Sequence, residues 1–341
     1  MRYWLFLCGV FGIPGIAPGQ NEYDTSYYVS YADEIIGRLY LSQKYVSFRY
    51  IDSGNDVAFR YLPNTRLNMG VGATYKWATL NLAYGFGFLN PENGKGETKY
   101  FDLQGHFYAR RITVDLIGHT YKGFYLTDED YKSPGGDFYL RPDMRLNGVG
   151  LTGQYILNSE RFSYRAGFLQ NEWQKKSAGT MLLGWQLILG SVSADSSLVP
   201  RKINEEINAS GPDRVAFFET GPSVGYAYQL VIGKHLYVMG SLAAVLTFGT
   251  VVSEGETRER SSSFIPNITY HAFAGYNSET WAISLTFTNS VVNISGTLSD
   301  EWFSMDAGNV RLNFARRFRV KRDLLEGLGS GRRRPSSFSA L

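Results

Sequence analysis

Long stretches of this sequence alternate between apolar residues and small or polar ones. Between Leu67 and Trp77 the odd-numbered positions are apolar or aromatic, and the even-numbered ones are Asn, Gly, Thr and Lys. Similar alternating faces run through Leu80–Phe88, Leu236–Phe248 and Trp281–Phe287. A period of two is typical of β-strands whose two faces meet different surroundings. The sequence therefore predicts an all-β fold.

The length of these segments separates two kinds of all-β protein. Strands of a soluble sandwich average about five or six residues, whereas the alternating segments here run past ten. A strand that crosses a bilayer needs about 9–11 residues, apolar outward and polar inward. Because lipid offers the backbone no hydrogen-bond partner, such strands must close into a barrel. We expect a transmembrane antiparallel up-and-down β-barrel, with a soluble periplasmic β-domain as the alternative.

The composition agrees with a membrane barrel. Aromatic residues make up 15% of the chain and charged residues 19%, against about 25% charged in an ordinary soluble domain. So many aromatics exclude a disordered chain. Tryptophan side chains anchor barrels at the two membrane interfaces. The predicted anchors are Trp77, Trp173, Trp185, Trp281 and Trp302.

The number of strands follows from the segments that alternate. The predicted segments are 35–50, 57–76, 78–89, 97–111, 112–126, 143–158, 161–174, 179–193, 215–231, 235–250, 264–277, 279–293 and 303–319. These are thirteen, whereas bacterial single-chain barrels have even numbers. Either another strand lies between 174 and 215, or the first segment is not part of the wall. We predict about twelve strands, with fourteen as the alternative.

The two ends of the chain lie outside the predicted barrel. Residues 1–19 have the pattern of an export signal: Arg2, an apolar run, and a small-residue site that places cleavage between Gly19 and Gln20. Residues 20–34 are then a periplasmic segment, 35–319 the barrel and 320–341 a flexible basic tail. The single cysteine, Cys8, falls in the signal. The mature chain would have no disulfide, thiolate metal site or cysteine nucleophile.

Charge and location fix the expected partners. The formal net charge is +3, but the tail from Arg319 onward carries six basic and two acidic residues. The nearly neutral remainder predicts no nucleic-acid partner. An exported monomeric barrel of this type, carried through the Sec pathway to the outer membrane of a Gram-negative bacterium, would contact outer-membrane lipids and lipopolysaccharide. The segment Val310–Phe318 is similar to the terminal strand that barrels present to the barrel-assembly machinery.

Several stretches resemble the domain of unknown function 4421 family, a group of uncharacterised Bacteroidota proteins. The matching residues are Arg38–Ser42, Tyr61–Asn64, Leu67–Gly72, Tyr75–Lys76, Lys175–Gly179, Ser197–Pro200 and Gly221–Tyr226. The resemblance implies an outer-membrane barrel and supplies no activity.

Assigning the polar face inward places several charged side chains in the lumen. If Arg110–Arg111 is a tight turn, paired positions of the flanking strands sum to 221. Directly opposed residues in a sheet have Cβ atoms about 5 Å apart, so two Asp–His pairs would stack. The predicted luminal cluster is Asp102, His106, Asp115 and His119. The other predicted luminal charges are Arg38, Arg165, Glu219, His271 and Arg311.

This cluster has two interpretations. Narrow barrels fill their lumen with charge networks that hold the wall together, and a histidine beside a carboxylate also suits proton transfer or metal binding. The favoured function is a barrel that passes or binds a small solute, or that is structural. The alternative is an outer-membrane hydrolase with the His106/Asp115 pair as base. The sequence assigns no catalytic residue, metal ligand or cofactor, because no nucleophilic triad or phosphate-binding loop is present at motif spacing.

Overall fold

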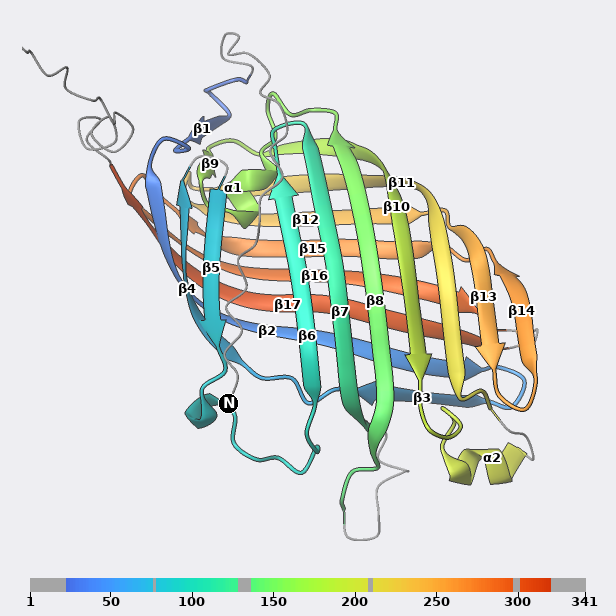
Figure 1. Ribbon diagram of the computed structural model, residues 1–341. Coiled ribbons are helices and arrows are strands. Elements are labelled where there is room, and N and C mark those ends of the chain that lie inside the picture. The colour runs from blue at the N-terminus through green and yellow to red at the C-terminus, as the bar shows by residue number, and fades with distance from the viewer. Residues whose placement is uncertain (1–22, 76–77, 128–135, 208–210, 297–300, 320–341) are drawn as a thin grey trace, which may run out of the picture.

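The chain forms an antiparallel transmembrane β-barrel in a computed structural model that describes residues 23–75, 78–127, 136–207, 211–296 and 301–319 (Figure 1). The strands are β1 (Tyr28–Ser30), β2 (Ile35–Asp52), β3 (Val57–Leu62), β4 (Asn68–Tyr75), β5 (Ala78–Tyr84), β6 (Lys99–Tyr108), β7 (Ile112–Leu126), β8 (Leu140–Ile156), β9 (Glu172–Gln174), β10 (Ala178–Ser193), β11 (Arg214–Ile232), β12 (Leu236–Val245), β13 (Phe248–Glu254), β14 (Arg258–Ser263), β15 (Asn267–Asn277), β16 (Trp281–Ser295) and β17 (Glu301–Phe318). The helices are α1 (Tyr164–Phe168), α2 (Arg201–Ile207) and the 3-10 turn η1 (Gly87–Leu89).

The wall is a hydrogen-bonded ring. Its order is β10-β8-β7-β3-β2-β17-β16-β15-β12-β11, and β11 pairs back with β10. β3 and β4 lie end to end along β2, as β12 and β13 do along β11, and β14 is followed by β15 after a break at 264–266. With each such pair counted as one strand, the described residues hold twelve wall strands, ten of them in the ring. Twelve strands agree with the number predicted from the sequence.

The predicted strand over 161–174 is wrong. These residues turn into the lumen and form α1 and β9, and β9 pairs with β1 rather than with the wall. A helix starts here because the Ser163 hydroxyl accepts a hydrogen bond from the Ala166 amide at 3.0 Å, which caps the first turn. Phe162, Tyr164 and Ala166 are buried inside the barrel. We call residues 157–177 the plug.

The two ends of the barrel differ in their connections. The short connections 109–111, 233–235 and 278–280 lie at the end where β2 begins and β17 finishes. The long connections 85–98, 127–139 and 194–213 lie at the other end. Since barrels have short periplasmic turns and longer external loops, we call these the periplasmic and the outer end. The plug follows β8 at the periplasmic end.

The polarity of the two faces reverses along the strands. Toward the periplasmic end the predicted arrangement holds: Leu39 of β2 and Tyr226 of β11 point outward, 59% and 50% exposed. Toward the outer end the apolar side chains face inward, as Phe48 and Phe217 do. The prediction that the apolar face points outward along whole strands is therefore wrong for the outer half. Strands of 15–19 residues exceed the 9–11 that a bilayer requires, so the remainder projects into water and buries its apolar face.

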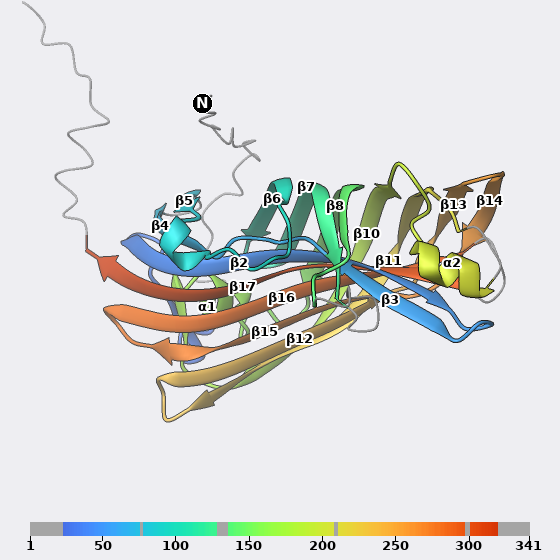
Figure 2. The ribbon, with the colours of Figure 1, turned by 90° about the horizontal axis from the view of Figure 1, so that it is seen from below.

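Side chains fill much of the interior. Figure 2 shows β12, β15, β16 and β17 as one layer and β6, β7, β8 and β10 as the other. An apolar cluster between them occupies the outer half and includes Phe48, Met144 and Leu198. A second cluster around Tyr164 and Phe273 joins the plug to the wall at the periplasmic half. The described part of the chain contains no helix long and apolar enough to cross a membrane.

Candidate functional site

The wall has a seam between two strands that are consecutive in the chain. β5 pairs with β4 and β6 pairs with β7, and no ladder joins β5 to β6 among the described residues. The ring instead closes through β3 and β7, by the two pairs Tyr61↔Leu126 and Leu62↔Tyr125. The residues of β5 with described burial, 79–84, are all exposed. In Figure 1 the β5 and β6 arrows stand apart, whereas β6, β7 and β8 run side by side.

A lysine on β2 binds the edge strand β6 at this seam. Lys44 Nζ donates to Asp102 Oδ1 at 3.0 Å and to the backbone carbonyl of Asp102 at 2.8 Å. The hydroxyl of Tyr121 donates to the other carboxylate oxygen. The side chain of Asp102 is 1% exposed and that of Lys44 24%. We call Lys44, Asp102 and Tyr121 the seam clasp, because they tie β2, β6 and β7 together from inside.

The register of β6 and β7 is the one that the Arg110–Arg111 turn predicts. Asp102 lies opposite His119, and His106 lies opposite Asp115. The second pair is in contact, with His106 Nδ1 2.6 Å from Asp115 Oδ1. Tyr108 also donates to Asp115 Oδ1, at 3.1 Å. The ring of Phe168, from the plug, lies 5.0 Å from that of His106, so this pair is a contact surface for the plug.

The other predicted pair makes no side-chain contact. The carboxylate of Asp102 binds Lys44 and Tyr121, and both ring nitrogens of His119 are buried without a hydrogen-bond partner among the described residues. The imidazole lies over Gly148, where a Cβ atom would come within 2.3 Å of Nε2. His119 also lines a small cavity of about 30 Å³, which has the size of a single water site.

The plug is held by arginines of the wall. Arg38 donates to the carbonyl of Leu169 and to the Thr74 hydroxyl. Arg317 donates to the carbonyl of Gln170 at 2.6 Å and to Asn277 Oδ1 at 2.7 Å. Carbonyls at the end of a helix lack internal partners, so these guanidinium groups satisfy and fix the end of α1.

The remaining predicted luminal charges each contact another side chain. Glu219 accepts from Ser263 at 2.7 Å and from Asn267 at 2.9 Å. His271 Nδ1 lies 2.6 Å from the Tyr164 hydroxyl of the plug. The guanidinium of Arg311 lies 4.6 Å from the centre of the Tyr40 ring. Arg165 was predicted to lie on a wall strand, but it belongs to α1. Its Nη1 lies 3.3 Å from Glu172 Oε1.

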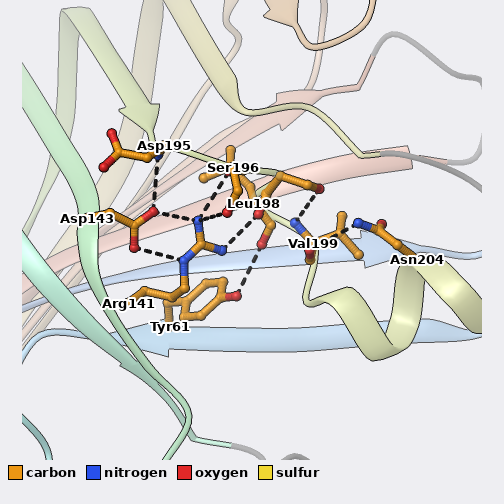
Figure 3. A network of polar contacts seen from close by, with 9 residues as sticks. Tyr61, Arg141, Asp143, Asp195, Ser196, Leu198, Val199 and Asn204 are labelled. Atoms are coloured by element: carbon orange, nitrogen blue, oxygen red, sulfur yellow. Dashed lines mark hydrogen bonds and ion pairs between the residues drawn. The ribbon is translucent and has the colours of Figure 1, made fainter.

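The outer end is covered by residues 194–207, which we call the cap. Arg141 at the start of β8 donates to the carbonyls of Ser197 at 2.8 Å and Ser196 at 3.2 Å (Figure 3). Arg141 also binds both carboxylate oxygens of Asp143, at 3.0 and 2.9 Å. The wall carries a band of exposed apolar side chains, such as Leu183 and Val224, which we call the apolar belt. Asp143 lies on the outer side of this belt, and its hydrogen bonds to Arg141 lower the pKa of its carboxyl. The side chains of Leu198, Val199 and Ile203 of the cap are buried in the outer cluster.

The N-terminal segment is joined to the plug. β1 pairs with β9 over Tyr28↔Gln174, Val29↔Trp173 and Ser30↔Glu172. The Tyr28 hydroxyl donates to the carbonyl of Ser159 at 2.9 Å. The predicted periplasmic segment 20–34 therefore lies against the plug from residue 23 onward. The predicted signal 1–19 and the tail 320–341 lie outside the described residues.

A family model fits the chain over most of its length. The model for Domain of unknown function (DUF4421) matches residues 22–318. The chain belongs to the DUF4421 family. No curated protein matches the chain in sequence.

Solved structures with a similar strand arrangement to this DUF4421 chain are outer-membrane barrels. The outer-membrane protease OmpT from Escherichia coli is 11% identical, with a TM-score of 0.39, and the match covers 85% of this chain and 98% of that one. The CymD monoaromatic hydrocarbon channel is 8% identical (TM-score 0.29; coverage 83% and 89%). The toluene transporter TodX of P. putida is 6% identical (TM-score 0.25; coverage 85% and 91%). We draw no functional conclusion from these likenesses.

Sequence reasoning missed the residues that close the DUF4421 barrel. Alternation places Lys44 and Arg317 on the inward face, as it does Arg38, but gives no partner for them. Arg141 and the polar groups of the cap come together only through the long connection after β10. Among the described residues no group of three His, Cys, Asp or Glu side chains could hold a metal ion.

Of the predicted tryptophan anchors, two point outward within the belt and one does not. Trp185 and Trp281 are 51% and 39% exposed, whereas Trp173 is buried in the plug. Trp77 lies outside the described residues. Trp302 is half-buried on β17, near the outer end.

Proposed function

We propose that the chain is a plugged barrel that binds a small amphiphilic solute and passes it sideways, between the lumen and the membrane, through the seam. The observation that carries the proposal is the absence of a ladder between β5 and β6 among the described residues. A lateral route distinguishes this barrel from a pore that runs along its axis.

An open strand edge is costly within a bilayer. Backbone groups without a hydrogen-bond partner in hydrocarbon cost several kcal/mol each, so irregular edges are found where they line a cavity or are covered by protein. β5 and β6 nevertheless present such edges in the same wall. A wall that kept its seam permanently shut would gain these hydrogen bonds, and we infer that the opening is retained because a molecule passes through it.

Both axial routes are obstructed. The plug occupies the periplasmic half, and wall arginines bind its carbonyls. The cap and the apolar cluster around Phe48 and Leu198 fill the outer half. An ion or a hydrated solute that crossed along the axis would have to displace both obstructions, whereas a solute that enters from the membrane meets neither of them first.

The edge strand supplies polar groups behind the seam. β6 carries Asp102 and His106 on its inward face, in contact with Lys44 and Asp115 respectively. An amphiphile whose tail remains in the apolar belt would bring its polar head to these groups. Lys44 contacts β6 through Asp102, and its ammonium group suits a carboxylate or phosphate head.

Location and partners follow from the same proposal. We infer export through the Sec pathway and residence in the outer membrane of a Gram-negative bacterium, as a monomer in contact with lipid and lipopolysaccharide. Assembly would use the barrel-assembly machinery. The exposed apolar belt on β10 and β11, with Leu183 and Val224 among its residues, supports residence in a membrane.

The hydrolase alternative rests on the His106–Asp115 contact. A hydrolase of this kind needs a nucleophile within reach of the base. Within the described part of the chain, Nδ1 of His106 has Asp115 and Tyr108 as hydrogen-bond partners, and the ring of Phe168 lies 5.0 Å from the imidazole. This arrangement supports a plug contact more than a base that activates a serine.

A cross-link across the seam tests the lateral route. Leu82 of β5 and Leu103 of β6 both point outward, and Cys8 is the one cysteine of the sequence. The L82C/L103C double variant, reconstituted in vesicles, is treated with bis-maleimides of stepped length. A photoreactive long-chain fatty acid in the bilayer then reports access, because peptide mapping separates labelled inward residues from labelled outward ones. We expect the cross-link to abolish inward labelling near Asp102 and to leave outward labelling unchanged.

A matched pair within a closed part of the wall is the control. Leu183 and Val224 are directly opposed on β10 and β11, and both point outward. Cross-linked L183C/V224C should keep inward labelling. Inward labelling that survives the seam cross-link, or that is missing in the unmodified protein, contradicts the proposal.

A further inference from the structure

The outward face of the wall next to the seam contains an apolar groove. It has a volume of about 570 Å³ and lies over β5, β4, β2, β17 and β16. Its lining includes Leu39, Val71, Leu82, Leu312 and Phe314. These side chains belong to the belt, so in a membrane the groove faces hydrocarbon and not water.

The periplasmic end of the groove is marked by an arginine and a tryptophan. Arg316 follows Phe314 by two residues on the same face of β17, a step of about 7 Å along a strand. Arg316 is exposed, and Trp281 lies directly opposite it on β16. The rings of Trp281 and Phe314 lie 6.3 Å apart. Tryptophan and arginine side chains in this position lie at the level of the lipid headgroups.

We propose that this groove is a binding site for a phospholipid of the periplasmic leaflet, with an acyl chain over Val71 and Leu312 and the phosphate at Arg316. The proposal rests on the membrane residence inferred above, but not on passage through the seam. Two observations select this occupant. The groove is lined mainly by apolar side chains and opens to the bilayer, and the cation stands at its periplasmic end, opposite Trp281.

Charge near the site favours an anionic head. Arg319, the last residue described, is also exposed, but its Nε lies 3.6 Å from Glu34 Oε1, which offsets its charge and makes Arg316 the cation of the site. Within the membrane surface region each basic residue contributes a factor of roughly five to the affinity for anionic lipid. A bound lipid in this position would have its chain beside Leu82 of β5, and so beside one edge of the seam.

Native mass spectrometry of the whole protein tests the site. Detergent-solubilised, delipidated protein is titrated with dioleoyl phosphatidylglycerol or dioleoyl phosphatidylcholine. We expect one tightly retained phosphatidylglycerol, and R316Q should lower its affinity about fivefold. K234Q removes a charge from the periplasmic turn between β11 and β12, away from the groove, and should leave retention unchanged. Equal retention by R316Q and the wild type, or retention that inorganic phosphate abolishes, overturns the headgroup assignment.

The position of the lipid's acyl chain is tested separately. Phosphatidylglycerol with brominated acyl chains should quench the Trp281 fluorescence, measured as the difference between the wild type and W281F. V71W fills the groove and should reduce this quenching and lower lipid retention. V224W, an equivalent change on the belt at β11, should do neither. This assay does not use the seam cross-link, so its result does not depend on whether a solute passes through the seam. Quenching that V71W does not change overturns the groove as the binding site.

Discussion

Lys44 of β2 and Asp102 of β6 are joined twice, through the carboxylate at 3.0 Å and through the backbone carbonyl at 2.8 Å. The second bond reaches the backbone of β6, a strand that has no ladder with β5 among the described residues. The pair therefore ties β2 to one edge of the seam through both a side chain and the main chain. It also makes the seam dependent on one removable cation.

Replacing Lys44 with Met should loosen the seam. The change leaves the buried Asp102 carboxylate with one partner fewer, and hydrogen bonds to charged groups are worth about 2 kcal/mol. We expect a lower unfolding temperature, seen as a heat-dependent shift in gel mobility, together with faster inward labelling by the photoreactive fatty acid. K44R should retain both properties. If K44M matches the wild type in both assays, the clasp has no part in closing the seam.

Replacing Arg317 with Met should release the plug. Arg317 bonds Gln170 and Asn277, and without it the end of α1 keeps only the hydrogen bond from Arg38 to Leu169 of the two arginine contacts with the wall. We expect proteinase K to cut within residues 157–177 several times faster in R317M than in the wild type. In planar bilayers both proteins should be electrically silent, because the outer apolar cluster still closes the axis. R316M removes the neighbouring charge on the outward face and should match the wild type in both assays. Steady conductance from the wild type would contradict an obstructed axis.

Replacing Arg141 with Met should free the cap. The variant loses the hydrogen bonds to Ser196 and Ser197 and leaves Asp143 without its guanidinium partner. We expect proteinase K to cut within residues 194–207 at least several times faster than in the wild type, while the barrel remains heat-modifiable. R201M is the control because Arg201 is exposed on α2, where substitutions change stability by less than about 0.5 kcal/mol. Equal cleavage of R141M and the wild type would contradict this prediction and would show that apolar contacts alone hold the cap.

The same contact predicts an acid-sensitive cap. The pKa of Asp143 is lowered by its hydrogen bonds to Arg141, so the stabilisation is complete above the ordinary carboxyl value near 3.8 and is lost as the pH falls through the folded-state pKa. We expect cap cleavage, assayed with an acid-active protease, to rise on acidification below pH 4. D143N should abolish this dependence, and an unchanged acid response in D143N would assign it to another group.

Replacing His106 with Ala separates a plug contact from a catalytic base. The variant removes the contact with Asp115 and the ring packing on Phe168, and we expect a loss of about 1–3 kcal/mol in stability. Hydrolysis of ester and peptide substrates by wild type and H106A should be equal. A folded H106A protein that loses a hydrolytic activity of the wild type would favour the enzyme.

The sequence of this chain determined the barrel and part of its interior. Alternation placed Val71, Leu82 and Leu285 outward, where the structure has them, because a strand has a period of two and a bilayer accepts apolar side chains on one face. It also gave the register of β6 and β7, since a tight turn at Arg110–Arg111 fixes which residues are opposed. The His106–Asp115 contact follows from that register.

Only the tertiary structure decided where the barrel is open and what fills it. Residues 161–174 alternate like a strand of the wall. In the structure they lie inside the barrel, where protein surrounds both of their faces. There Ser163 caps the short helix α1, and the segment forms the plug. Asp102 was expected to contact His119, its neighbour across β6 and β7, and instead binds Lys44, 58 residues earlier in the chain. Local spacing cannot reveal such contacts, because they depend on the way the sheet curves back on itself. The seam arises in the same way, from a ring that closes through β3 and leaves β5 at an edge.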